Sequence, residues 1–171
     1  MIRKKIEQIA TQILDEFDVS ELPVPIISIA EKIGLKIFNY DLGENISGAL
    51  VIDNGQGIIG INPIESTVRQ RFTVAHELGH YILHKNDESL FVDKDFKVLF
   101  RNQESSSGEI KREQDANAFA AAILMPQKLL AEIIKNMSID LTDESSIKDL
   151  AKMFDVSATA MTYRILNLNL A

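Results

Sequence analysis

The stretch His76-Glu77-Leu78-Gly79-His80 constrains this chain more than any other part of the sequence. On a helix, histidines four residues apart lie about one turn apart on the same face, so both imidazoles can reach one metal ion while Glu77 stands beside it. A Zn²⁺ ion needs neutral nitrogen ligands and an open position for water, and the water needs an adjacent base. The motif is typical of zinc-dependent peptidases.

The residues around the motif favour the helix that this chemistry requires. Thr67 and Gln70 can form a capping box just upstream. His84 extends the histidine series but lies two turns from His76, about 12 Å along the axis, so we assign it to packing or to support of the site rather than to metal binding. Without further evidence, two histidines on a half-buried helix can simply be hydrogen-bonded core residues. An apolar stripe of helical period accompanies the motif and comprises Phe72, Ala75, Gly79, Ile82 and Leu83.

Composition narrows the class of protein and of metal site. The chain has 171 residues, enough for one domain with a proper core, and contains no cysteine, so any metal must be held by histidine and carboxylate. Its net charge of −7 argues against broad nucleic-acid binding. The longest apolar run, residues 118–125, is far too short to cross a bilayer, and the N-terminus lacks the features of a signal peptide. We therefore expect a cytoplasmic protein.

A catalytic zinc needs a third protein ligand, and a second predicted helix, residues 110–124, offers one. Glu113 and Asn117 are four residues apart and share one face of this helix. Glu113 would bind the metal, and Asn117 would hold a histidine ring by a hydrogen bond. Glu109 and Asp115 compete for the ligand role, Asp115 less well because it points about 200° round the helix from Glu113. Taken alone, Glu113 could equally be a solvated carboxylate.

Hydrophobic periodicity predicts helices and strands along the rest of the chain. Helices are expected at residues 2–17 and 25–33, strands at 35–40, 48–52 and 58–61, and a further helix from Pro126. Asn54-Gly55 is a strong hairpin signal, because both residues tolerate positive φ, so we expect a small, mainly antiparallel sheet before the motif helix. Strand 48–52 or 58–61 could pair with an extended substrate, although an ordinary packing strand is at least as good an interpretation. The segment 85–109 is polar and irregular, and is either a mobile flap or a surface loop.

The tail resembles a helix-turn-helix unit, with two short helices predicted between residues 145 and 168 around a turn at Val156-Ser157. The second helix, which would enter DNA, offers only Arg164 as a basic side chain. Phosphate contacts normally need several Lys or Arg, so we favour a packing role for the tail over DNA reading. The net charge of residues 145–166 is only +1, from Lys148, Lys152 and Arg164 against Asp149 and Asp155.

Two segments, RFTVAHELGH at 71–80 and EQDANAFAAAILMP at 113–126, together resemble the ImmA/IrrE family of metallo-endopeptidases. The resemblance covers about residues 25–135. It implies a thermolysin-like active site in which His76, His80 and Glu113 bind zinc and Glu77 is the base. It also implies a regulatory role, the cleavage of a helix-turn-helix repressor or antitoxin-like partner that relieves repression of phage, mobile-element or stress-response genes. Asp115 stands where Glu is commoner in the family.

We therefore predict an α+β protein: a mostly helical zincin-like metallopeptidase domain with a small antiparallel sheet at residues 1–137, followed by a helix-turn-helix-like segment at 138–171 packed on it. Glu77 would take a proton from water and later deliver it to the leaving amine. The alternative is a metal-binding transcriptional regulator or repressor-binding module without peptidase activity, against which the presence of Glu77 argues. We expect a protein substrate and neither DNA nor membrane binding. Candidate donors to the oxyanion are Tyr81, His84, Tyr163 and Arg164.

Overall fold

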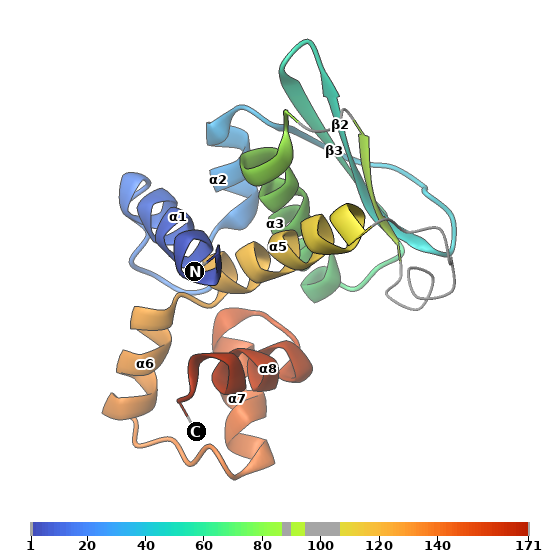
Figure 1. Cartoon of the computed structure of the whole chain (residues 1–171). Coiled ribbons are helices and arrows are strands. Elements are labelled where there is room, and N and C mark those ends of the chain that lie inside the picture. The colour runs from blue at the N-terminus through green and yellow to red at the C-terminus, as the bar shows by residue number, and fades with distance from the viewer. Residues whose placement is uncertain (1, 87–89, 95–106, 171) are drawn as a thin grey trace. The chain divides into compact units, whose positions relative to one another are not determined.

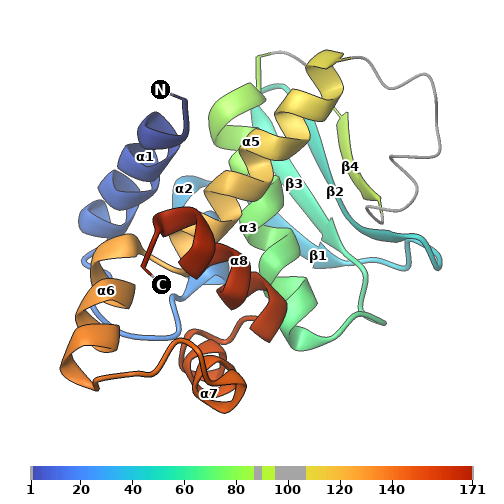
Figure 2. The same cartoon turned by 60° about the horizontal axis from the view of Figure 1, so that its bottom comes forward.

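The computed structural model describes residues 2–86, 90–94 and 107–170. Within these ranges the chain forms seven α-helices and four β-strands, so the predicted α+β class and its mostly helical character are confirmed (Figures 1 and 2). The chain divides into two compact units, one formed by Ile26–Ala120 and the other by Met1–Pro25 together with Ala121–Ala171. The domain boundary that the sequence suggests after residue 137 stays a prediction.

The unit Ile26–Ala120 is built on a four-stranded sheet with the order β1-β3-β2-β4. Strand β2 pairs antiparallel with β3 and β4, but β1 pairs parallel with β3, so the sheet is mixed and the prediction of an antiparallel sheet is wrong for β1. The hairpin places β2 along one edge of β3. Strand β1 therefore pairs with the other edge, where it runs in the same direction as β3. The strands are β1 (Lys36–Asn39), β2 (Ile46–Asp53), β3 (Gln56–Ile61) and β4 (Leu90–Lys94).

The predicted hairpin joins β2 to β3, with φ of 48° at Asn54 and 81° at Gly55. Both strands lie inside the sheet and are hydrogen-bonded on either side, so the hypothesis that one of them pairs with a substrate is wrong. Strand β4 falls in the segment 85–109, for which the sequence predicts irregular structure. Pairing with β2, a long-range contact, decides its conformation. The rest of the flap hypothesis concerns residues 87–89 and 95–106, which lie outside the described part.

The motif helix α3 (Thr67–His84) packs against β2 and β3 on one face of the sheet (Figure 2). Its N-cap is Ser66, whose extended backbone lets the hydroxyl accept a hydrogen bond from the Arg69 amide at 3.2 Å. The predicted capping box of Thr67 and Gln70 is therefore wrong, because Thr67 already lies inside the first turn.

A run of eight consecutive residues of α3, from 73 to 80, is buried. A helix with only the sheet as neighbour would bury one stripe, whereas here α2 (Ile26–Ile33) also contacts α3, and α5 (Ser107–Leu124) meets it at Gly79. The motif residues therefore lie in an environment from which water is largely excluded.

Helix α5 begins three residues before the helix predicted at 110–124 and ends where that helix was expected to end. Pro126 is the N-cap of α6 (Gln127–Asn136), in agreement with the predicted start of a helix there. No single described helix is long and apolar enough to cross a membrane. Taken as a bent pair, α5 and α6 pass that test by length and composition alone.

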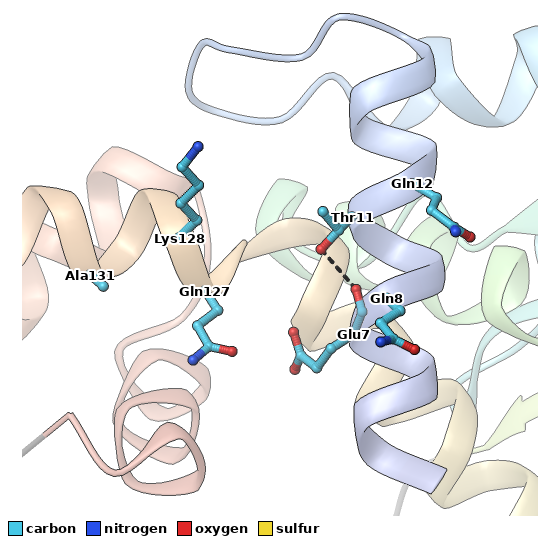
Figure 3. A pocket seen from close by; sticks show the side chains of 7 residues that line it. All are labelled: Glu7, Gln8, Thr11, Gln12, Gln127, Lys128 and Ala131. Carbon is cyan, nitrogen blue, oxygen red and sulfur yellow. Dashed lines mark hydrogen bonds between the residues drawn. The ribbon is translucent and has the colours of Figure 1, made fainter. Parts of the chain in front are cut away.

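The other unit contains α1 (Ile2–Glu16), α6, α7 (Glu144–Phe154) and α8 (Ala158–Leu168). Helices α7 and α8 match the pair predicted in the tail, and Ser157 caps α8 by accepting a hydrogen bond from the Ala160 amide at 3.1 Å. The helix-turn-helix character of the pair stays a prediction. An open groove of about 690 Å³ runs between α1 and α6 (Figure 3). It is lined by Glu7, Gln8, Thr11, Gln12, Gln127, Lys128 and Ala131.

Arg164, the single basic residue of α8, is buried. Its guanidinium forms a bidentate ion pair with the carboxylate of Glu7 on α1, with Nη2 2.9 Å from Oε2. Its Nε donates to the backbone carbonyl of Met125 at 2.9 Å. Arg164 thus ties α8 to α1, which supports a packing role for this helix and leaves its guanidinium unsuited to contact phosphate or a substrate oxyanion.

We expect Arg164→Ala to lower the free energy of unfolding by about 2–4 kcal/mol, because it leaves the Glu7 carboxylate and a buried carbonyl without their donor. Tyr163→Ala is the matched control, since the neighbouring side chain on the same helix is 64% exposed and its loss should change stability by less than about 0.5 kcal/mol. Urea unfolding followed by circular dichroism measures both. Equal effects in the two variants would contradict the assignment.

Candidate metal centre

Helices α3 and α5 bring three potential metal ligands together, His76, His80 and Glu113, with ligand atoms that all lie within 4.8 Å of one another. The Nε2 atoms of the two histidines are 3.0 Å apart, and the Glu113 oxygens lie 3.2 and 3.1 Å from them. Ligands at 2.0–2.1 Å from a tetrahedral zinc are separated by about 3.4 Å. The spacing therefore fits one metal ion of this kind to within a few tenths of an ångström.

The orientation of His76 is set by Asn117, one turn beyond Glu113 on α5. The Oδ1 atom of Asn117 lies 3.1 Å from Nδ1 of His76, so the predicted hydrogen bond between Asn117 and a histidine ring is present. With the amide oxygen as acceptor, Nδ1 carries the proton and Nε2 presents a lone pair. The Nε2 atom faces the Glu113 carboxylate, at 3.2 Å from its Oε2 atom.

The electrostatics of the three side chains also suit a cation. Burial lowers the pKa of His80 below its ordinary value, although a hydrogen bond to Glu113 opposes the shift. Burial raises the pKa of Glu113, but hydrogen bonds to His76 and His80 outweigh it and hold that pKa at about 2. An anionic carboxylate and a neutral imidazole are the protonation states that metal binding needs. A divalent cation at this place would take over the role of the protons that these hydrogen bonds share.

Glu77 lies between the two histidines in the motif and is fully buried. Its Oε1 would be 3.7 Å from a Cβ atom at Gly48 of β2, so the carboxylate faces that strand. The same Cβ would lie 2.2 Å from Cγ2 of Thr73, so only glycine fits at position 48. A buried carboxylate beside two histidines that could hold a metal ion is placed where a general base could act.

The other sequence-predicted candidates lie apart from this cluster. Among the described residues the metal-ligand group does not include Glu109, Asp115 or His84. The ring centroid of His84 is 5.9 Å from that of His80, in keeping with the packing role assigned to it. The hydroxyl of Tyr81 donates to the carbonyl of Gly55 at 3.3 Å, so it holds the β2–β3 hairpin.

Phe91 on β4 is a residue of the site that sequence reasoning misses. Its ring stacks on the imidazole of His80, with centroids 4.5 Å apart and planes inclined by 20°. Phe72 lies farther from His76, at 6.2 Å between centroids. No local signal marks Phe91, because only the pairing of β4 with β2 carries this residue to the motif helix.

Gly79, inside the motif, sets the distance between the two helices. A Cβ atom at this position would lie 3.2 Å from both Cα and the carbonyl oxygen of Ala116 on α5, and 3.2 Å from the ring of Phe119. The backbones of α3 and α5 can approach so closely only because residue 79 has no side chain. Glu113 lies one turn before Ala116 and reaches the histidines as a result.

Comparison with known proteins agrees with this geometry. A family model described as the IrrE N-terminal-like domain matches residues 30–166. The chain belongs to this family. It is 34% identical over 113 residues to the radiation response metalloprotease IrrE of Deinococcus radiodurans, a match that covers 66% of this chain and 32% of that protein. It is 31% identical over 131 residues to the metallopeptidase ImmA of Bacillus subtilis, covering 75% and 68%. The predicted ImmA/IrrE resemblance is thereby confirmed.

A solved structure titled Mycobacterium tuberculosis transcriptional regulator shares the fold. Its TM-score is 0.65 over 95% of this chain and 46% of that chain, at 14% sequence identity. At this identity the similarity concerns the fold alone. This chain matches about a third of the length of the Deinococcus family member.

We expect Gly79→Ala to weaken zinc binding by about tenfold or more, because a Cβ forces α5 outward by a few tenths of an ångström and moves Glu113 off its position. Alanine by itself favours a helix over glycine by up to about 1 kcal/mol, so the loss would be steric in origin. Competition with a zinc chelator measures the affinity.

The matched control is Gly60→Ala on β3, where a Cβ would meet its nearest neighbours at 3.9 Å, an ordinary contact. This variant should bind zinc as the parent does. If Gly79→Ala also retains the parent's affinity, the close approach of the helices is not what positions the carboxylate.

Proposed function

We propose that this protein is a zinc-dependent endopeptidase that cleaves a helix-turn-helix type transcriptional repressor or an antitoxin-like partner. The observation that carries the proposal is the convergence of His76, His80 and Glu113 at metal-ligand spacing next to the buried Glu77. Membership of a family whose relatives are named metalloproteases supports the same chemistry. Cleavage would relieve repression of phage, mobile-element or stress-response genes.

In this proposal each residue has a distinct task. His76, His80 and Glu113 would hold Zn²⁺, which supplies a Lewis acid that polarises the scissile carbonyl and makes water more acidic. Asn117 keeps the His76 ring in the tautomer that presents Nε2. Glu77 would accept the proton of the attacking water and return it to the leaving amine.

Two observations support a protein partner over DNA. Arg164, the only cation of α8, is buried in its ion pair with Glu7, which disfavours a phosphate contact by this helix. The net charge of −7 also disfavours nonspecific binding to nucleic acid. Since repressors act on DNA in the cytoplasm, the proposal places this protein in the same compartment.

The second candidate function, a metal-binding regulator without peptidase activity, explains less of the site. A purely structural or sensory metal needs ligands but no adjacent base. The site nevertheless contains a second carboxylate, that of Glu77, which is fully buried beside the two histidines. The peptidase hypothesis assigns this carboxylate the role of the base.

Replacement of Glu77 and replacement of Glu113 should abolish different properties of the protein. Glu77→Gln keeps all three ligands and should retain about one zinc per chain while cleavage falls by about two to four orders of magnitude, because the proton acceptor is lost. Glu113→Ala removes a charged ligand and should weaken zinc binding by more than the roughly 100-fold typical of an outer-sphere loss. Metal analysis after dialysis, next to a cleavage assay, measures both.

Asp115→Ala is the matched control, since Asp115 lies on α5 two residues from Glu113 but outside the ligand cluster. It should keep both zinc and activity, with a small loss of stability. A Glu77→Gln variant that still cleaves would refute the role of base. Loss of zinc in Asp115→Ala but not in Glu113→Ala would refute the ligand assignment.

We expect the zinc-loaded protein to cut a cognate helix-turn-helix repressor at one or a few bonds and to digest casein poorly. His76, Glu77 and His80 are at most 2% exposed, so a substrate must first open the site, and contacts with a specific partner would supply that free energy. Mass spectrometry of the products from both substrates provides the measurement. Rapid, indiscriminate digestion of casein would count against a regulatory role.

A further inference from the structure

We propose that Phe91 is a positioning residue for His80, whose imidazole it holds by ring stacking where His76 is held by a hydrogen bond. The inference rests on the proposed metal centre. It concerns how a metal-binding imidazole is kept in orientation, and it assigns that task to strand β4.

The two histidines differ in the way their rings are held. Nδ1 of His76 has the amide oxygen of Asn117 as its partner at 3.1 Å. Nδ1 of His80 is buried and has no hydrogen-bond partner among the residues that the structure describes. A ligating imidazole is normally fixed through the nitrogen that does not bind the metal. His80 therefore needs another constraint.

Phe91 supplies a constraint of the right shape. Its ring lies nearly parallel to the imidazole of His80, at 4.5 Å between centroids and 20° between planes. The rings of His76 and His80 are nearly perpendicular, with 4.7 Å between centroids and 81° between planes. Both stacked rings are buried, with 5% of Phe91 and 1% of His80 exposed. Rotation of the imidazole about its Cβ–Cγ bond would drive its edge into the phenyl face.

The stack should favour the metal-bound state over the metal-free state. Coordination of a cation draws electron density from an imidazole and makes the ring more positive, while the face of a phenyl ring carries partial negative charge. The attraction between the two faces therefore grows when metal binds. Only such a difference between the states contributes to affinity, so Phe91 acts on metal binding as well as on the stability of the fold.

The position of Phe91 depends on the sheet. Phe91 pairs with Leu50 of β2, and a shift of one residue in this register would turn the phenyl ring to the opposite face of the sheet. The affinity of the site for metal is thereby linked to the placement of β4, a strand with one described neighbour in the sheet.

The test compares zinc affinity, by chelator competition, in Phe91→Leu, Phe91→Tyr and the parent. Phe91→Leu keeps an apolar side chain of similar size without a ring face and should bind zinc about tenfold more weakly. Phe91→Tyr keeps the ring face and should recover most of the affinity. The absorption spectrum of the Co²⁺-loaded protein should change in Phe91→Leu, because the His80 ligand is less well oriented.

The matched control is Val92→Ala, which perturbs the next residue of β4 on the opposite face of the sheet. It should leave zinc affinity near that of the parent. Equal losses in Val92→Ala and Phe91→Leu, or parental affinity in Phe91→Leu, would overturn the inference. A metal-free readout is the ring-current shift of the His80 protons in the NMR spectrum. The part of this shift that Phe91 causes should be lost in Phe91→Leu, while the shifts of the His76 protons change little.

These measurements separate the inference from the proposed function. A parent protein that binds zinc but cuts no substrate would refute the peptidase activity and leave the affinity comparison decisive for Phe91. A parent protein that binds no zinc would refute the metal centre and the inference with it. Parental binding in all variants would refute only the role of Phe91.

Discussion

The candidate site depends on one close contact, the approach of α3 to α5 at Gly79. A Cβ atom at this position would lie only 3.2 Å from the backbone of Ala116, so the two helices meet more closely than a side chain would allow without a shift. That contact carries Glu113 and Asn117 to the histidines of α3, one as a carboxylate neighbour and one as a hydrogen-bond partner. Glycine in the motif is therefore needed for the distance between the helices, while the flanking histidines are candidate metal ligands.

The same packing removes water from a group of polar and charged side chains. Burial of charge is unfavourable unless a partner compensates it, and here the anionic Glu113 faces two imidazole nitrogens. A divalent cation at the centre would satisfy all three side chains at once. The two imidazoles are oriented by different physical means, an amide oxygen for His76 and an aromatic face for His80. Side chains on helix α5 and on strand β4 thus each orient one histidine of the cluster.

The C-terminal helices have a sequence pattern typical of DNA binding, but the basic side chain of α8 serves helix packing instead. The sequence of the tail predicts two helices around a turn, and Ser157 caps α8 as expected. Its only cation on α8, Arg164, is nonetheless buried against Glu7 of α1 and the carbonyl of Met125. A guanidinium satisfied in this way stabilises helix packing, and the exposed face of α8 is left without positive charge of its own.

Features that depend on local spacing could be predicted from the sequence alone. They are the helices, the Asn54-Gly55 hairpin, the one-turn separation of His76 and His80, the shared helix face of Glu113 and Asn117, and the two short segments that indicate the family. Each follows from residues a few positions apart, where backbone geometry alone decides which side chains share a face. Tertiary structure decided the parallel pairing of β1, the cap at Ser66, the existence of β4 and the stack of Phe91 on His80. The strand pairings and the ring stack join residues that are distant in the chain, so they stabilise the protein only once its elements have packed. The cap depends on which of two neighbouring hydroxyls the folded chain turns toward the first amides of the helix.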